Sequence, residues 1–113
     1  MMSKFDDCME KYRASFAEMK TEFDDALLTK VAKGLGPSIY LKDASTIAGS
    51  DKKELDTVKN NFLIKKLGLT DGPELDSAIQ EVIEKFGKSN KNKHRAVFYY
   101  LLAKKFGKES IYG

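Results

Sequence analysis

Apolar residues recur every three to four positions along most of the chain, which is the spacing of amphipathic α-helices. The pattern predicts an all-α fold, a compact single-domain bundle of about five helices over residues 1–113. The expected helices span about 4–20, 21–33, 50–67, 73–86 and 89–106.

Capping residues frame these predicted helices. Ser3 and Ser50 are good N-caps for the first and third helices, and the second is expected to open at Thr21 or Glu22. Pro73 suits the first turn of the fourth helix. Glycines at positions 34 and 36, 68, 87 and 107 stand where helices are expected to end.

The longest stretch without helical periodicity is residues 34–50, between the second and third predicted helices. It reads GLGPSIYLKDASTIAGS and keeps several apolar residues. A connection this long is uncommon in a compact domain unless it contains short turns pinned to the core, and Pro37 can begin such a turn. One of Asn60 and Asn61 in the third helix is a candidate to turn inward and hydrogen-bond this segment, and the alternative is that both are exposed.

Residues 96–103, AVFYYLLA, form the longest apolar run of the chain. A short buried strand also fits such a run. We favour a helix because Ser89 or Asn90 can cap its start and Gly107 can end it. A helix that is apolar on most of its circumference must be surrounded by other elements, so this helix is predicted to be central. Ile111 and Tyr112, in the short tail after it, are expected to dock on the core.

Basic residues gather where this central helix is predicted to begin. A helix N-terminus carries positive partial charge, so Lys91, Lys93 and Arg95 in its first two turns would each be unfavourable by about 0.3–1 kcal/mol. Free backbone N–H groups beside such cations can bind an anion. The candidate anion-binding residues are Lys88, Ser89, Asn90, Lys91, Lys93, His94 and Arg95. The alternative is a solvated lysine face, or one paired with acidic residues of neighbouring helices.

Charge is distributed unevenly along the 113 residues. Residues 88–113 hold seven basic residues and one acidic residue, whereas residues 1–87 hold 13 and 16. A basic region on a slightly acidic body favours anionic partners, with nucleic acid or an acidic protein surface as candidates. Phe98, Tyr99 and Tyr100 are expected in the core rather than as platforms for bases. The same asymmetry also fits self-association, in which the acidic body of one copy meets the basic end of another.

The inventory of reactive residues gives no support for catalysis. One histidine and one cysteine cannot form a zinc site, and the acidic residues do not show the spacing of an EF-hand. No Ser/His/Asp set with its supporting motifs is present. We therefore expect a noncatalytic binding module without metal or cofactor. Cys8 is expected to pack as a small core residue.

The sequence shows no apolar signal segment at its start and no run of 18 apolar residues that would suit a membrane span. A cytoplasmic protein with no membrane partner is therefore expected.

Three stretches carry a resemblance to a known family. They are ALLTKVAKGLGPSIY (26–40), SDKKELDTVKNNFLIKKLGLTDGPELD (50–76) and KSNKNKHRAVFYYLLAKKFGKESIY (88–112). In these stretches the chain resembles a family of small uncharacterised bacterial proteins catalogued as a domain of unknown function. The resemblance implies a compact helical protein of bacterial origin. It assigns no activity and no catalytic or binding residue.

Overall fold

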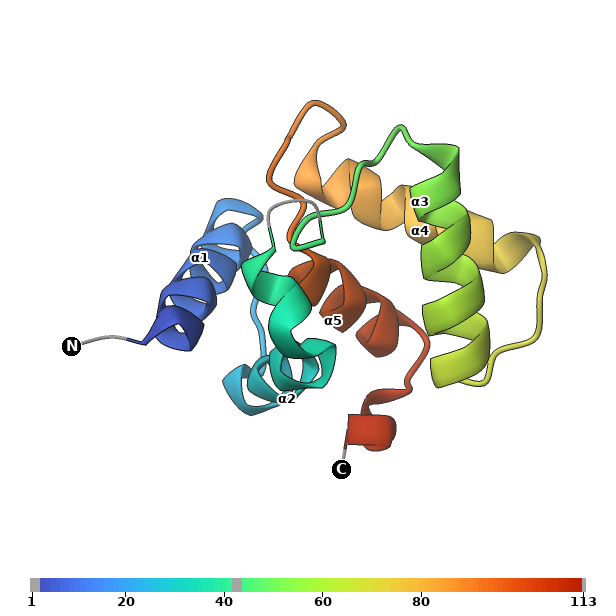
Figure 1. Cartoon of the computed structure of the whole chain (residues 1–113). Helices are drawn as coiled ribbons and strands as arrows, with labels where there is room; N and C mark the ends of the chain where they lie inside the picture. Colours follow the sequence, from blue (N-terminus) through green and yellow to red (C-terminus); the bar gives the residue numbers. More distant parts are fainter. Residues whose placement is uncertain (1–2, 42–43, 113) are drawn as a thin grey trace.

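Five α-helices surround one hydrophobic core, and the helix nearest the C-terminus lies at its centre (Figure 1). The computed structural model describes residues 3–41 and 44–112, and this part of the chain is helical without a β-strand. The prediction of an all-α fold is confirmed. The α-helices are α1 (Lys4–Glu18), α2 (Asp25–Leu35), α3 (Lys52–Thr57), α4 (Pro73–Phe86) and α5 (Arg95–Lys105). Two 3₁₀ helices, η1 (Gly36–Tyr40) and η3 (Glu109–Tyr112), and one π-helix, η2 (Val58–Lys66), complete it.

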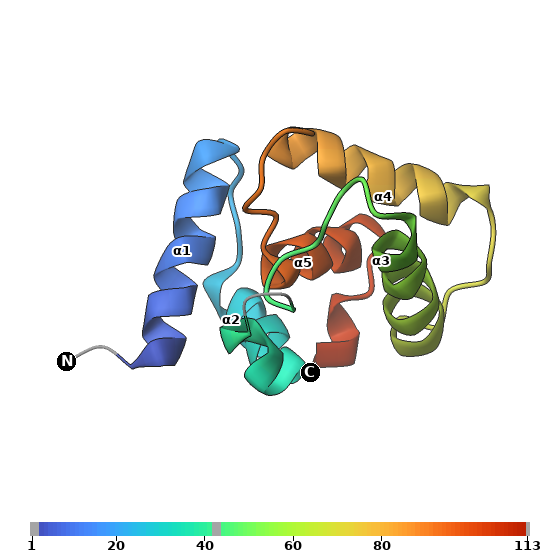
Figure 2. The ribbon, with the colours of Figure 1, turned by 45° about the horizontal axis from the view of Figure 1, so that its top comes forward.

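Helix α5 is the centre of the core because it is apolar on nearly every side. It packs against α1, α2 and α4, and Figure 2 shows it enclosed by these helices. Phe98 is fully buried and stacks on Phe86 of α4 at 6.0 Å between ring centroids. Tyr99 and Tyr100 are also buried, which confirms the prediction that these aromatics form core. In the described residues no helix combines the length and apolar character required to cross a membrane.

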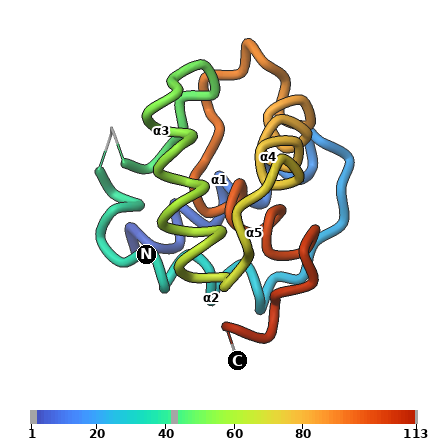
Figure 3. Tube along the Cα trace, turned by 90° about the vertical axis from the view of Figure 1, so that its right-hand side faces the viewer, coloured from blue at the N-terminus to red at the C-terminus, as the bar shows by residue number. Residues whose placement is uncertain are grey.

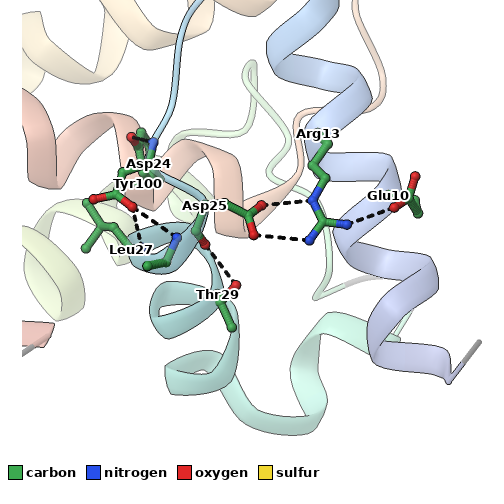
Figure 4. Close-up of polar contacts among 8 residues, drawn as sticks. Glu10, Arg13, Asp24, Asp25, Leu27, Thr29 and Tyr100 are labelled. Carbon is green, nitrogen blue, oxygen red and sulfur yellow. Dashed lines mark hydrogen bonds and ion pairs between the residues drawn. The ribbon is translucent and has the colours of Figure 1, made fainter.

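Polar contacts join α1 to α2 and α2 to α5 (Figure 4). The N-cap of α2 is Asp24, whose backbone N–H donates to the hydroxyl of Tyr100 at 2.7 Å. Arg13 of α1 reaches Asp25 at 2.8 Å, with both side chains substantially exposed. Exposed ion pairs stabilise weakly, so the Tyr100 contact is the more important of the two.

Helix α3 continues directly into the π-helix η2, which the sequence analysis did not predict. In η2 the Leu67 N–H donates to the Phe62 carbonyl, five residues back, at 2.9 Å. The buried positions Val58, Phe62, Leu63 and Leu67 follow one another in steps of four, one and four residues. Val58 and Leu67 are nine residues apart, which is two and a half turns of an α-helix at 3.6 residues per turn and would place them on opposite sides. The wider turn of the π-helix places all four residues on the buried face. Phe62 stacks on Tyr99 at 3.9 Å between ring centroids.

Figure 3 shows the continuous course of α3 and η2 along one side of the molecule, with α4 beside it. Asn60 and Asn61 are both exposed on η2, so the hypothesis of an inward hydrogen bond to residues 34–50 is wrong. The face of η2 that is turned to the core is entirely apolar, which leaves no place for an amide there.

The segment 34–50 is anchored by two buried isoleucines. Pro37 lies in the first turn of η1, as predicted, and Ile39 and Ile47 are 4% and 3% exposed. Tyr40 and Leu41, between these anchors, are 45% and 58% exposed. The apolar residues of the segment are therefore only partly buried: the two isoleucines lie in the core, and Tyr40 and Leu41 are exposed.

The C-terminal tail docks on the core through one of its two predicted residues. η3 packs against α2, and the half-buried Tyr112 lies under the Lys66 ammonium, 5.1 Å from its ring centroid. Ile111 is 40% exposed, so the prediction that it docks is wrong.

Helix boundaries shifted by a few residues where several residues could serve as caps. α2 begins at Asp25 rather than at Thr21 or Glu22, because the Asp24 side chain accepts from the N–H groups of residues 26 and 27. The N-cap of α3 is Asp51, not Ser50, because the Asp51 carboxylate accepts from the Lys53 N–H.

We expect Tyr100→Phe to lower the free energy of unfolding by about 1–2 kcal/mol, because the Asp24 N–H loses its acceptor while the ring stays in the core. Urea denaturation measures this change. Tyr40→Phe is the matched control, since Tyr40 is exposed, and it should change stability by less than about 0.5 kcal/mol. Equal stabilities of wild type and Tyr100→Phe would show that this hydrogen bond does not hold α2 to α5.

Candidate functional site

The predicted anion-binding residues lie mostly in a loop, not in a helix. Helix α4 ends at Gly87, whose φ of 96° suits glycine, and α5 begins only at Arg95. The prediction that Ser89 or Asn90 caps the central helix is therefore wrong. The predicted cluster of three cations in the first two turns of the central helix is also not observed. Lys91 and Lys93 precede the helix, and only Arg95 lies within it.

A backbone contact with the segment 44–51 explains the late start of α5. The Ile47 N–H donates to the Lys93 carbonyl at 2.8 Å, and the Arg95 N–H donates to the Ser45 carbonyl at 2.8 Å. Thr46 and His94 form an isolated antiparallel bridge between these bonds. His94 is thereby held extended, with φ −59° and ψ 129°, and residues 88–94 cannot join the helix. In Figure 1 the two loops meet above the start of α5.

Lys93 turns into the protein instead of toward an anion. It is 3% exposed, and its ammonium donates to the backbone carbonyls of Lys88, at 3.0 Å, and of Asn90. Burial lowers the pKa of Lys93. Gly49 lies against it, since a Cβ at that position would come within 3.1 Å of the lysine Cε. Lys93 therefore holds its own loop in shape.

Arg95 is bound by three groups of its own chain. Its guanidinium donates to the Ala44 carbonyl at 2.7 Å and to the Tyr99 hydroxyl at 2.9 Å, and it forms an ion pair with Glu54 of α3. The side chains of Arg95 and Glu54 are only 12% and 24% exposed. This cluster links the segment 34–50, α3 and α5, and it corresponds to the alternative of pairing with an acidic residue of a neighbouring helix.

Two clefts flank the paired loops. The first, about 620 Å³, lies between α1, η1 and the loops, and Lys4, Lys11, Lys91 and His94 contribute its basic and imidazole groups. The second, about 760 Å³, lies on the other side of the bridge, and Lys88, Ser89, Asn90, Lys91 and Lys93 are among its lining residues. Extended backbone sends successive side chains to opposite faces, which explains why His94 lines the first cleft and Lys93 the second. Lys91 lines both.

The first cleft has an aromatic and apolar wall. Tyr12 meets His94 edge to face at 5.4 Å between ring centroids, and Cys8 and Ile39 also line the cleft. Burial, and secondarily Lys11, holds the pKa of His94 below 6.5, opposed by Glu18. Burial also raises the pKa of Tyr12, with Cys8 adding to the effect. Both rings are therefore neutral at pH 7, and the charge of this cleft comes from lysines and Asp7.

Three lysines of the first cleft, Lys4, Lys11 and Lys91, are exposed and form no ion pair within residues 3–41 and 44–112. The sequence analysis did not single out Lys4 and Lys11. Their separation of seven residues places them on one face of α1, about 10 Å apart along the helix axis, but nothing in the sequence showed that this face borders the loop at 88–94.

The other basic residues near the C-terminus lie apart from these clefts. Lys104 and Lys105, at the far end of α5, pair with Glu109 at 3.7 Å and with Glu81. Lys108 lines neither cleft. The seven basic residues after position 87 therefore do not form one patch.

In the described ranges no group of three or more His, Cys, Asp or Glu residues could hold a metal ion.

The sequence profile of the family described as "Protein of unknown function (DUF2853)" matches residues 9–110. The chain belongs to this family. A search of curated proteins found no match. Membership in DUF2853 agrees with the resemblance seen in the sequence and assigns no site, so the site rests on the arrangement of the side chains.

We expect Glu54→Gln to destabilise the protein by about 2 kcal/mol, because it leaves the Arg95 guanidinium half-buried without its counter-charge. Equilibrium urea denaturation gives the value. Glu10→Gln, which removes the exposed partner of Arg13, is the matched control and should change stability by less than about 0.5 kcal/mol. Similar effects of the two substitutions would mean that the Arg95 cluster is no more important than a surface pair.

Stability should fall between about pH 7 and pH 5 in a way that depends on His94. Its pKa is lower in the folded protein than in the unfolded chain, so the unfolded state binds more protons than the folded state in this range. Lowering the pH therefore stabilises the unfolded state relative to the folded state. Urea titrations at several pH values, with His94→Gln as the comparison, measure the effect. The variant should lose less stability than the wild type over this interval. If the stabilities of the two proteins fell in parallel as the pH is lowered, the pH dependence would not come from His94.

Proposed function

We propose that this DUF2853 protein is a noncatalytic binding module, and that its basic loop region engages an anionic partner. The observation that carries the proposal is a set of four exposed lysines from two elements that form no ion pair in the described part of the chain. We call this set the basic surface; it comprises Lys4, Lys11, Lys88 and Lys91.

Folding gives no evident reason for these four lysines to lie together. Arg13, Lys59 and Arg95 each hold a carboxylate and thereby connect parts of the chain, whereas the lysines of the basic surface line the two clefts without an ion-pair partner in the described residues. Clustered positive charge raises the local concentration of anions and speeds their association. A polyanion gains most from it, because each phosphate contacted releases counterions.

The predicted site residues have different roles within this proposal. Lys88 and Lys91 contact the partner, and Ser89, Asn90 and His94 line the clefts beside them. Lys93 and Arg95 act indirectly, by holding the shape of the loop and its attachment to α3. Nucleic acid is the candidate polyanion, and an acidic protein surface is the second.

A protein-interaction or self-association role is supported by a different observation. Tyr40, which lines the first cleft, and its neighbour Leu41 are exposed apolar side chains. An exposed apolar pair beside lysines also suits a protein partner with acidic residues, including a second copy of this chain. Sedimentation at high protein concentration separates the two functions, because self-association requires a dimer that dissociates on dilution.

We also propose a cytoplasmic location and a bacterial origin for the protein. Fractionation of cells that express the protein tests the location.

We expect the protein to bind heparin and a 20-base-pair DNA duplex at low salt, with affinity that falls steeply as salt rises. Lys11→Gln/Lys91→Gln should lower the log–log salt slope for the duplex by about 2, since each phosphate contact contributes about 0.9. Fluorescence anisotropy over a range of salt concentrations measures the slope.

The matched control is Lys65→Gln/Lys85→Gln, which removes the same net charge from exposed lysines that line neither cleft. It should leave the slope nearly unchanged. Equal losses in both double variants would show that net charge alone drives binding. Passage of the wild type through a heparin column at low salt would refute polyanion binding.

A further inference from the structure

The basic surface continues across the paired loops from one cleft to the other. Lys4 and Lys11 stand on α1 at one side of the first cleft, Lys91 borders both clefts, and Lys88 lines the second. Lysines spread over two adjoining clefts cannot all contact a single compact anion. The arrangement fits a ligand with several negative groups in a row.

The acidic residues of the clefts are mostly engaged by their own chain. In the second cleft Asp51 caps α3 by accepting from the Lys53 N–H at 3.0 Å, and Glu54 is paired with Arg95. In the first cleft Asp7 is exposed on α1 and forms no ion pair in the described part of the chain. Among the described residues that line the two clefts, Asp7 is thus the carboxylate with neither an ion pair nor a capping contact, and its charge opposes an anionic ligand.

An exposed aromatic ring lies beside the lysines. Tyr40 lines the first cleft and keeps 45% of its surface exposed, although the other aromatic residue of that cleft, Tyr12, is buried. Proteins that hold single-stranded nucleic acids combine a basic groove with aromatic rings on which bases stack. The first cleft has both features, and the aromatic residue comes from η1, outside the apolar run of α5.

We propose that the basic surface binds single-stranded nucleic acid, with phosphates along Lys4, Lys11, Lys91 and Lys88 and a base stacked on Tyr40. The proposal rests on the anion-binding function above and names its partner. The bases of a single strand can leave their stack and reach Tyr40, whereas those of a duplex are enclosed between neighbouring base pairs.

The cations of the basic surface suit contacts to a phosphate backbone that do not depend on the base sequence. Arginine binds carboxylates and phosphates through two parallel hydrogen bonds, whereas lysine binds phosphates as a point charge. The chain has two arginines, Arg13 and Arg95, and both already hold carboxylates of their own chain. Every cation of the basic surface is a lysine.

The test compares a fluorescein-labelled 15-nucleotide oligothymidylate with a duplex of the same length at low salt. We expect the single strand to bind at least fivefold more tightly. Tyr40→Ala should weaken single-strand binding about tenfold, and Tyr40→Phe, which keeps the ring, should bind as the wild type does. Leu41→Ala, at the neighbouring exposed position, is the control and should have little effect. Asp7→Asn should strengthen binding about threefold, because it removes the opposing charge.

Folding of each variant is verified by circular dichroism and thermal melting, and the exposed positions of Tyr40, Leu41 and Asp7 should leave both unchanged. Equal affinity for single strand and duplex, with no effect of Tyr40→Ala, would overturn this inference and leave the anion-binding function standing. Thymidine monophosphate that competes as well as the oligomer at equal nucleotide concentration would also overturn it. Binding to neither nucleic acid nor heparin would overturn both proposals.

Discussion

The antiparallel contact between residues 45–47 and 93–95 is the constraint on which the functional region depends. Its two backbone hydrogen bonds, each 2.8 Å long, join segments almost 50 residues apart in the sequence. The contact holds His94 extended and ends the loop at the first turn of α5. It also places the Arg95 guanidinium beside Glu54 and the carbonyl of Ala44. One local pairing therefore sets the loop, the start of the central helix and the attachment of α3.

The same contact divides neighbouring lysines between structural and exposed positions. Lys93 is enclosed and donates to two carbonyls of its own loop, whereas Lys91, two residues earlier, is exposed on the rim of both clefts. A buried ammonium is tolerated only with hydrogen-bond acceptors around it, and the turn at Lys88–Asn90 supplies them. A loop held from inside in this way keeps Lys88 and Lys91 in fixed positions for an external anion. This separation of roles is the physical basis of the proposed binding surface.

A thiol and an imidazole lie in the first cleft, and both are engaged by their own chain. Cys8 and His94 line the cleft, but the Cys8 thiol is directed to the Ile39 carbonyl at 3.8 Å and His94 packs against the ring of Tyr12. Membership in a family of unknown function adds no catalytic residue. What distinguishes this region is a group of lysines that form no ion pair in the described part of the chain, beside an exposed tyrosine.

The sequence by itself determined the helical fold, the central position of α5 and the burial of Phe98, Tyr99 and Tyr100, because these follow from periodicity and from an apolar run that must be enclosed. It also contains a signal for η2, since Val58 and Leu67 are nine residues apart and would lie on opposite sides of an α-helix, although both are apolar. Only the tertiary structure decided which cations are exposed. Lys91 and Lys93 have similar neighbours in the sequence, but Lys91 is exposed and Lys93 is buried, because residues 45–47 pair with one side of the loop. Lys4 and Lys11 line the same cleft as Lys91 because contacts between distant segments bring α1 beside that loop. No local sequence pattern encodes these contacts.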